Sequence, residues 1–376
     1  MARILVLGSF AESLINFRGP LLKAMAECGH TVVGCAPSAS LEIRQNLCAI
    51  RISYRDIPLY RAGLNPFRDL STLCALVALF REVRPDVVFN YTIKPVIYGS
   101  LAARWAGVPA IYSMITGAGY AFLGTGIRGY CVGHLSRLLY KWSLGGNRKV
   151  FFQNPDDRHL FQNLALLHDA NQAVLVNGSG VDIDRFKPAA FPSILAFLLM
   201  ARLQRDKGVV EFIQAARVIK AQHPDVVFRL AGWIDPSPMA ISETDLMQWV
   251  KEGVIEYLGN LEDVRPAITH ATVYVLPSYR EGTPRTVLES MAMGRPIITT
   301  DAPGCRETVV DGENGFLVPV KNVDALVHAM KRFILEPELI EKMGRRSREI
   351  AEEKYDVHKV NAVIMKTMGL LGEKTV

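Results

Sequence analysis

Short apolar runs alternate with amphipathic stretches along almost the whole chain, and this rhythm limits the folds open to it. Runs such as residues 3–8, 31–35 and 87–90 are mostly apolar, as expected of strands covered on both faces. The segments between them have helical spacing, as in 19–28 and 70–83. This alternation predicts the α/β class, with parallel sheets joined by crossover helices.

The rhythm runs through two sets of elements, and 376 residues is a length that favours two domains. A glycine- and aspartate-rich segment at 177–188 interrupts it. We therefore expect a first domain at 1–178, a linker at 179–192 and a second domain at 193–355. Both are expected to be doubly wound, Rossmann-like domains that face one another, with ligands bound in the cleft beyond the carboxyl ends of the strands.

Charge is divided unevenly between the two halves. Residues 1–180 carry 18 Lys and Arg against 10 Asp and Glu, a net charge of +8, whereas residues 181–376 carry 25 against 27. No acidic residue occurs between Asp86 and Asp156. The first half is therefore expected to meet something anionic, such as a phospholipid surface or a pyrophosphate, unless the cations merely cluster by chance on a solvated face.

Residues 105–127 contain no charge and are long enough to span a bilayer. Six residues of this stretch are Gly or Pro, so a strand followed by a glycine-rich loop is the better interpretation. The following segment, 130–143, combines Trp142 and several leucines with Arg137 and Lys141. Such a helix can lie in a membrane interface, although an ordinary packed helix explains it equally well.

Several patterns exclude other classes of protein. The GxGxxG at 124–129 lacks the preceding strand and the later acidic residue of a dinucleotide site. The Asp182/Asp184 pair lies in the expected linker, so we do not interpret it as a metal site. Six scattered cysteines without a CxxC pair exclude a structural zinc site and indicate a reducing compartment.

The most informative segment is 276–289, which reads LPSYREGTPRTVLE. A buried strand at 273–277 leads into a loop with Glu281, and a helix is expected to begin near Thr283. Thr283 suits an N-cap and Pro284 the first helical position. The amides and positive end of this helix would bind an anion, whereas Glu281 and Glu289 would accept hydrogen bonds from sugar or ribose hydroxyls.

A second segment, MARLQRDKG at 200–208, follows the first strand of the second set. Arg202 and Lys207 would both stand at the carboxyl end of that strand. An arginine fork and a lysine point charge are well matched to a diphosphate. We interpret Arg205 as a solvated cation.

Taken together, these residues resemble the GT-B glycosyltransferases of family 4. The likeness covers essentially the whole chain and rests on E-x7-E at Glu281/Glu289, R-x4-K at Arg202/Lys207, GVDIDRFKP at 180–188 and TDAPGCRE at 300–307. Within the family, SLINFR at 13–18, NPF at 65–67 and EGTP at 281–284 are similar to the bacterial PglA-like branch. That branch adds N-acetylgalactosamine to a polyprenyl-diphosphate-linked sugar.

The resemblance implies a retaining transfer from a nucleotide-diphosphate sugar, with no metal ion and no cofactor beyond this co-substrate. Arg202 and Lys207 would neutralise the leaving diphosphate, Glu281 would hold the donor sugar and Glu289 the ribose. The other implied donor-binding positions are Thr283, Pro284, Arg285 and Gly259. The family also implies that the last helix, at 356–376, crosses back onto the first domain.

The chain departs from the family at two places. Ser9–Ser13 lacks the double glycine that cradles phosphate in many members, so Asn16 and Arg18 are expected to face the acceptor instead, with Thr116 and Gly117 on the same side. Pro284 removes one amide donor from the turn. The first domain, acid-free between Asp86 and Asp156, offers no obvious carboxylate nucleophile, which agrees with a front-face mechanism.

The expected function is transfer of a sugar, an N-acetylhexosamine, from a UDP-sugar to a lipid-linked acceptor during capsule, O-antigen or other glycan assembly. The enzyme would work in the cytoplasm, peripherally on the inner face of the cell membrane. Two alternatives stay open: an epimerase of UDP-N-acetylhexosamine and an inactive scaffold module of the same fold. Nucleic acid is not an expected partner, because the cations do not interleave with stacking aromatics.

Overall fold

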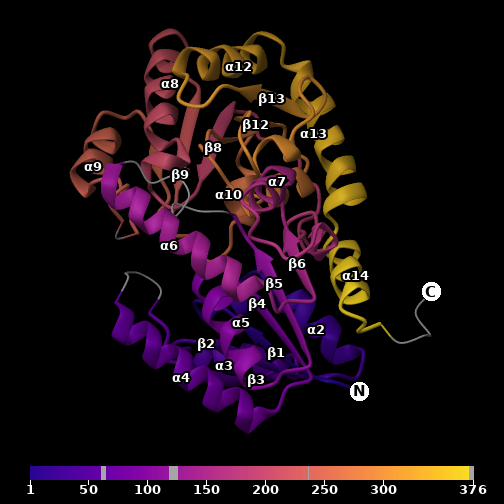
Figure 1. Cartoon of the computed structure of the whole chain (residues 1–376). Helices are drawn as coiled ribbons and strands as arrows, with labels where there is room; N and C mark the ends of the chain where they lie inside the picture. Colours follow the sequence, from indigo (N-terminus) through magenta and orange to yellow (C-terminus); the bar gives the residue numbers. More distant parts are fainter. Residues whose placement is uncertain (61–64, 118–125, 236, 372–376) are drawn as a thin grey trace. The chain divides into compact units, whose positions relative to one another are not determined.

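Two parallel sheets, one for each half of the chain, form the framework of the protein (Figure 1). The computed structural model describes residues 1–60, 65–117, 126–235 and 237–371, and side chains outside residues 126–131. The chain divides into one unit of Met1–Ser179 with His358–Val376 and another of Gly180–Val357. The predicted α/β class with doubly wound domains is confirmed.

The first unit has a seven-stranded sheet in the order β3-β2-β1-β4-β5-β6-β7. Ile4 of the central β1 pairs with Val32 on one side and Val87 on the other. The strands are β1 (Arg3–Leu7), β2 (Thr31–Ala36), β3 (Ser53–Asp56), β4 (Val87–Tyr91), β5 (Ala110–Ile115), β6 (Lys149–Phe152) and β7 (Ala173–Leu175). The helices and turns are α1 (Glu12–Asn16), α2 (Gly19–Glu27), α3 (Leu41–Ala49), α4 (Pro66–Val83), η1 (Pro95–Gly99), α5 (Ser100–Trp105), α6 (Gly126–Leu144), α7 (Pro155–Asn163), η3 (Ala170–Gln172) and α14 (Val357–Thr367).

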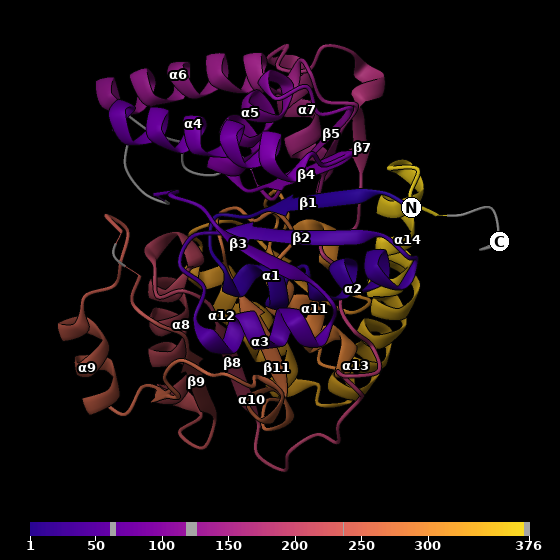
Figure 2. The same cartoon turned by 90° about the horizontal axis from the view of Figure 1, so that it is seen from below.

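Side chains alternate between the two faces of this sheet, and each face has its own hydrophobic cluster. Ile4 and Val6 pack with α1, α2, α3 and the C-terminal α14, whereas Leu5 and Leu7 pack with α4 to α7. Figure 2 shows the two helical layers on opposite sides of β1 and β4. The last helix is fixed in this unit by hydrogen bonds from Tyr112 to the carbonyl of Met368 and between His30 and the carbonyl of Leu370.

The second unit has a six-stranded sheet in the order β10-β9-β8-β11-β12-β13. Its strands are β8 (Ala196–Met200), β9 (Val227–Ala231), β10 (Glu256–Tyr257), β11 (Val273–Leu276), β12 (Ile297–Thr300) and β13 (Gly315–Val318). Its helices and turns are η4 (Arg205–Lys207), α8 (Val209–Gln222), α9 (Glu243–Lys251), α10 (Arg265–Thr269), α11 (Arg285–Ala292), η5 (Arg306–Thr308), α12 (Val323–Leu335), α13 (Glu338–Ile350) and η6 (Ala351–Tyr355).

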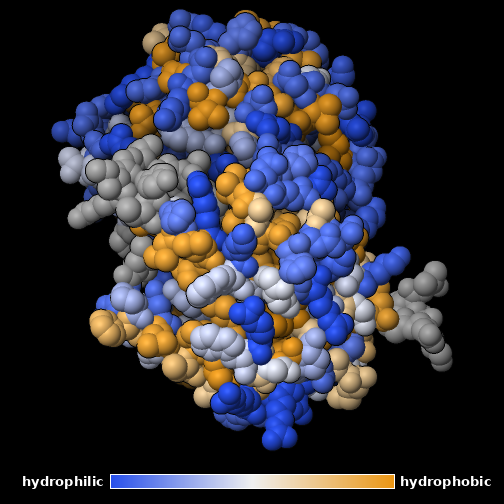
Figure 3. Space-filling view, in the orientation of Figure 1, coloured by the Kyte–Doolittle hydropathy of each residue, from blue (hydrophilic) through white to orange (hydrophobic). Residues whose placement is uncertain are grey.

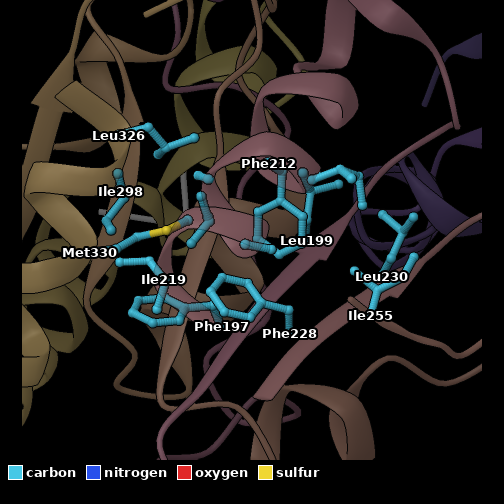
Figure 4. Close-up of a cluster of buried hydrophobic side chains, with 14 of the residues drawn as sticks. Phe197, Leu199, Phe212, Ile219, Phe228, Leu230, Ile255, Ile298, Leu326 and Met330 are labelled. Atoms are coloured by element: carbon cyan, nitrogen blue, oxygen red, sulfur yellow. The ribbon is translucent and has the colours of Figure 1, made fainter. Parts of the chain in front are cut away.

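Aromatic side chains anchor the larger hydrophobic cluster of this unit (Figure 4). Phe197 stacks on Phe228 with ring centroids 5.3 Å apart, and Phe212 meets Phe228 edge-on at 5.6 Å. Packing of this kind adds to the stability gained from burial alone. It packs α8 against the sheet at β8 and β9, and the loop after β8 leaves from the edge of that sheet.

The segment expected to link the two domains is held in the second unit. Val181 and Phe186 are buried in its second hydrophobic cluster. The guanidinium of Arg348 donates to the carbonyls of Ile183 and Phe186, at 3.2 and 2.9 Å. Residues 181–186 are therefore an ordered part of this unit.

Within the described residues, no helix combines the length and apolar character needed to cross a bilayer. The strand expected in the uncharged stretch 105–127 is present as β5, and α6 begins at Gly126. Residues 118–125 of that stretch, and with them Gly124 of the GxGxxG pattern, lie outside the described residues.

Candidate active site

In the second unit, the strand order reverses between β8 and β11. From β8 the sheet extends through β9 and β10 in one direction, and from β11 through β12 and β13 in the other. Ligands of open parallel sheets bind beyond the carboxyl ends of the strands at such a switch point. The loops at this position are 201–208 after β8 and 277–284 after β11, the two segments that the sequence singles out.

Lys207 and Glu281 meet at this switch point. The Nζ of Lys207 lies 2.5 Å from Oε1 of Glu281, and both side chains are more than four-fifths buried. The hydroxyl of Ser278 donates to the same carboxylate oxygen at 2.9 Å. Sequence reasoning predicted the first two residues but not Ser278, whose spacing to Glu281 carries no signal by itself.

Backbone contacts bind the two loops together. The amide of Tyr279 donates to the carbonyl of Asp206 at 2.8 Å, and the Ser278 hydroxyl reaches the same carbonyl at 3.1 Å. Gly208, with φ of 72°, lies so close that a Cβ there would be 2.2 Å from the carbonyl oxygen of Pro277. Only glycine fits this contact, which places Lys207 against the loop of Glu281.

Arg202 is paired with a carboxylate that the sequence did not indicate. Its Nη1 lies 2.8 Å from Oδ2 of Asp235, in the loop after β9. The loop is joined to that of Arg202 by hydrogen bonds from the amide of Leu203 to the carbonyl of Trp233 and from Arg205 to Met239. Since Arg202 remains about one-third exposed, its guanidinium keeps further donors for a ligand.

Glu289 lies on α11 and is almost fully buried. Its Oε1 accepts a hydrogen bond from Nε of Arg285 at 2.8 Å. Burial raises the pKa of Glu289, while the neighbouring Arg285 opposes that shift. A carboxylate held in this way has the acceptor oxygens that a diol needs, in the middle of the helix whose first amides suit an anion.

The expected start of this helix was one residue early. α11 begins at Arg285, and Pro284, with ψ of 113°, occupies the N-cap position. The hydroxyl of Thr283 donates to the carbonyl of Gly282 at 2.9 Å. The proline ring fixes only φ, so an extended ψ at Pro284 is allowed and delays the helix.

Gly259 follows β10 and has φ of 71°, with open space where a Cβ would lie. Its carbonyl accepts a hydrogen bond from the amide of Gly232 at 2.8 Å. Gly259 is thus placed beside the loop after β9 and has room for a ligand close to its backbone.

The acceptor-side candidates all lie at the carboxyl edge of the first sheet. Arg18 is buried, with its guanidinium 5.1 Å from the ring centre of Tyr91 and Nη2 2.8 Å from the sulfur of Met114 on β5. Thr116 and Gly117 follow β5, and Gly117 has φ of 121°. Asn16, at the end of α1, is exposed.

The Asp182/Asp184 pair has a structural role. The side chain of Asp182 accepts hydrogen bonds from the amides of Asp184 and Arg185, which closes a local turn. Across the described residues, no group of three or more His, Cys, Asp or Glu side chains is arranged to hold a metal ion.

Two family models match the chain in succession. The glycosyl transferase 4-like domain matches residues 18–178, and the glycosyl transferases group 1 domain matches residues 181–350. The second match contains every residue of the switch-point site described above.

Curated relatives match at moderate identity. One is the N,N'-diacetylbacillosaminyl-diphospho-undecaprenol alpha-1,3-N-acetylgalactosaminyltransferase of Campylobacter jejuni, 27% identical over 86% of this chain and 87% of the relative. Another is the UDP-Gal:alpha-D-GlcNAc-diphosphoundecaprenol alpha-1,3-galactosyltransferase of Escherichia coli, 25% identical over 73% of each chain.

Solved structures share the fold across nearly the whole chain. Anabaena HepE, crystallised with UDP and glucose, has a TM-score of 0.78 and 18% identity and covers 98% of this chain and 100% of its own. Sucrose-phosphate synthase from Thermosynechococcus elongatus has a TM-score of 0.82 at 17% identity, covering 99% of each chain. With both domain types in order and the GT-B fold, the chain belongs to the family 4 glycosyltransferases.

Proposed function

We propose that this glycosyltransferase transfers an N-acetylhexosamine from a UDP-sugar to a polyprenyl-diphosphate-linked acceptor in bacterial polysaccharide assembly. The observation that carries the donor side is the Lys207–Glu281 pair at the switch point, with Arg202 on the neighbouring loop. The names of the C. jejuni and E. coli relatives, both of which act on diphosphoundecaprenol-linked sugars, support the acceptor side.

The chemical task at the donor is to stabilise a departing nucleoside diphosphate. Arg202 and Lys207 supply two fixed positive charges where that charge develops, which is the kind of preorganised electrostatic stabilisation on which such transfers depend. The start of α11 adds backbone amides at the same edge of the sheet. Because these groups can supply the charge that a divalent cation supplies elsewhere, we propose that the reaction is metal-independent.

The two carboxylates would orient the donor rather than bind its phosphates. Glu281 already accepts hydrogen bonds from Lys207 and Ser278, so it can hold a sugar hydroxyl while keeping the ammonium in place. Glu289 would hold the ribose. Retention of the anomeric configuration is implied by the family resemblance, with the departing phosphate accepting the proton of the acceptor.

A membrane-facing surface on the first unit would give access to the lipid-linked acceptor. On α6, Leu135, Leu138 and Trp142 are 47%, 49% and 69% exposed beside the exposed Lys141. Arg104 of α5 donates to the carbonyl of Trp142 at 3.3 Å, so a second cation borders the same surface. Figure 3 shows apolar and charged side chains interspersed over this side of the first unit.

Exposed leucines and tryptophan among cations fit the interface of an anionic bilayer, where apolar side chains enter the headgroup region and cations meet lipid phosphates. We propose that the enzyme works peripherally, on the cytoplasmic face of the membrane.

The experiment that tests this function combines the purified protein with a panel of UDP-sugars and undecaprenyl-diphosphate-linked sugars, followed by mass spectrometry. Release of UDP together with an acceptor longer by one N-acetylhexosamine is expected. Conversion of the UDP-sugar without any acceptor would indicate an epimerase instead. Absence of both UDP binding and turnover would indicate an inactive module.

A further inference from the structure

The first unit has a switch point of its own, between β1 and β4, where the strand order also reverses. Ser13 of α1, the helix that follows β1, and Tyr91, the last residue of β4, are hydrogen-bonded through their hydroxyls at 2.6 Å. A Cβ on Gly8 would lie 2.3 Å from the Tyr91 hydroxyl. The residue that follows Tyr91 at this edge is Thr92, and ligands of parallel sheets bind in such a place.

Thr92 has a backbone conformation that its side chain disfavours. Its φ is 70°, in the left-handed region. Among the described non-glycine residues with positive φ it is the one with a β-branched side chain. A β-branched residue rarely adopts this conformation, because Cβ and its substituents crowd the backbone. Strain of this kind persists where a function needs it and the surroundings enforce it.

The surroundings of Thr92 do enforce it. Its carbonyl accepts a hydrogen bond from the amide of Val96 at 2.9 Å, and Val96 lies in the π-helical turn η1, one of two such turns in the described residues. Gly99 at the end of that turn lies against Asn90, where a Cβ would be 2.3 Å from Oδ1. Asn90 in turn donates to Ser100 at 3.2 Å. Turns of π-helix are rare and occur frequently at functional sites.

The Thr92 side chain gains no hydrogen bond from this strain. Its Oγ1 is buried and has no partner among the described residues. A buried hydroxyl without a partner is unfavourable, and in a native structure it needs an explanation. A ligand that donates to Thr92 and accepts from it would provide one.

A second polar group lies two residues further along the chain. The ammonium of Lys94 is 2.7 Å from Oδ1 of Asp69 on α4, and the two side chains are 14% and 11% exposed. Burial and the Asp69 carboxylate, to which the Tyr98 hydroxyl is hydrogen-bonded, raise the pKa of Tyr98. The carboxylate of Asp69 offsets the positive charge of Lys94. The ammonium has three N–H donors, so it keeps donors beyond the one that Asp69 uses.

These groups indicate the ligand. A sugar hydroxyl can both donate and accept, so it matches the Thr92 hydroxyl and the N–H donors that Lys94 keeps beside Asp69. We propose that Thr92 and Lys94 recognise the hydroxyl-bearing sugar of the acceptor rather than its diphosphate, and that Asp69 is the positioning residue for Lys94. The proposal rests on the proposed function and names the part of the acceptor that this edge binds.

Three variants of Thr92 distinguish a role of its side chain in recognising the acceptor from a purely structural role. Thr92→Ser keeps the hydroxyl, Thr92→Val keeps the shape without it, and Thr92→Gly relieves the backbone strain. We expect Val and Gly to raise the KM for the acceptor on the order of tenfold, and Ser to stay close to the wild type. Thr92→Gly should also melt at a higher temperature than the wild type, since glycine fits this φ.

The assay uses GlcNAc-diphosphoundecaprenol, or the undecaprenyl-diphosphate sugar that the substrate panel identifies, and sugar-free undecaprenyl diphosphate as inhibitor. Inhibition by the sugar-free lipid should be unchanged in Thr92→Val. The matched control is Ser38→Gly, which relieves positive φ at an exposed position after β2. It should raise the melting temperature without changing the acceptor KM.

Two results would overturn the proposal. Either Thr92→Val and Thr92→Gly keep the wild-type acceptor KM, or Thr92→Val weakens inhibition by the sugar-free lipid as much as it weakens acceptor binding. Calorimetric binding of UDP by the wild type and its turnover are measured first. Absence of UDP binding and of turnover would refute the proposed function itself. If the wild type binds and turns over UDP-sugar but the Thr92 variants behave as the wild type does, only this inference is refuted.

Discussion

The ammonium of Lys207 lies 2.5 Å from a carboxylate oxygen of Glu281, although 74 residues separate them along the chain. Each comes from a different loop, and both loops are bound to one another through Asp206 and Tyr279. The two residues meet because the loops that carry them follow parallel strands, whose carboxyl ends lie at the same edge of the sheet. Under the proposed function, the donor sugar diphosphate would bind beside this contact.

Replacement of Lys207 by alanine is expected to lower kcat by about 10²–10³, because it removes a preorganised charge from the departing diphosphate. Steady-state turnover of the UDP-sugar with saturating acceptor measures the effect. Arg345→Ala is the control, since that side chain pairs with Glu341 on the solvent side of α13 and both are more than two-thirds exposed. Equal turnover of Lys207→Ala and Arg345→Ala would remove Lys207 from the mechanism.

Gly208→Ala should destabilise the protein more than Gly253→Ala. Both glycines have φ near 70°, so both substitutions carry the same conformational cost of about 1 kcal/mol. At Gly208 the new Cβ would also lie 2.2 Å from the carbonyl of Pro277, whereas nothing lies within 4 Å at Gly253. We expect Gly208→Ala to cost about 2 kcal/mol or more beyond the control, measured by urea unfolding.

If the two alanine variants unfold at the same urea concentration, the close approach of the loops after β8 and β11 is not what fixes Lys207. A loss of activity in Gly208→Ala at a temperature where it remains folded would show that this approach also serves catalysis.

The sequence was sufficient to predict the strands that lie in the middle of each sheet. β1, β4, β5 and β8 are mostly apolar, since both of their faces are covered. It did not indicate β3, which reads SYRD and lies at the edge of its sheet, where one side meets solvent. Edge strands lack the continuous apolar pattern, because the side that meets solvent does not require apolar residues.

The same distinction applies to the candidate site. Arg202, Lys207 and Glu281 follow apolar strands at short distances, so their place at the sheet edge could be predicted, and Glu289 lies on the helix predicted to follow. Asp235 could not be, because it reaches Arg202 from 33 residues away in a loop without regular pattern. The strain at Thr92 is likewise invisible in a sequence, since it depends on how η1 packs against Asn90.

Glu289→Gln should make the protein more stable at neutral pH and less able to bind the donor. Burial raises the pKa of Glu289, so the folded state favours the protonated form. The stability from this group is then complete below the pKa of the unfolded chain, about 4.3, and is lost as pH rises through the higher folded pKa. A permanently neutral glutamine has no such loss.

Urea unfolding at pH 7 and at about pH 3.5 measures the effect. The variant should exceed the wild type at pH 7 and match it in acid, while its affinity for UDP falls. Glu341→Gln is the control, because the Glu341 side chain is 76% exposed. Equal pH dependence in Glu289→Gln and the wild type would contradict the prediction.

Arg295→Met is expected to destabilise the second unit by about 3 kcal/mol or more. The Arg295 side chain is fully buried and donates to the carbonyls of Ala189, Ala190, Ile268 and Thr269 at 2.9–3.2 Å. Methionine fills the space but leaves these oxygens without donors, at about 1–3 kcal/mol each when buried. Thermal and urea unfolding measure the loss, and Arg345→Met should stay within about 0.5 kcal/mol of the wild type.

Trp142→Ala should weaken binding to vesicles rich in phosphatidylglycerol by several-fold, because the indole no longer enters the headgroup region. Trp142 is 69% exposed on α6. Co-sedimentation at low and high salt measures the effect. Salt should weaken wild-type binding, because the exposed Lys141 precedes Trp142 on α6 and Arg104 donates to the Trp142 carbonyl. Trp233→Ala, which removes a 47% exposed tryptophan from the second unit, should bind as the wild type does. Binding insensitive to both salt and Trp142 would place the membrane contact elsewhere, since neither the cations nor the indole of this surface would then contribute to it.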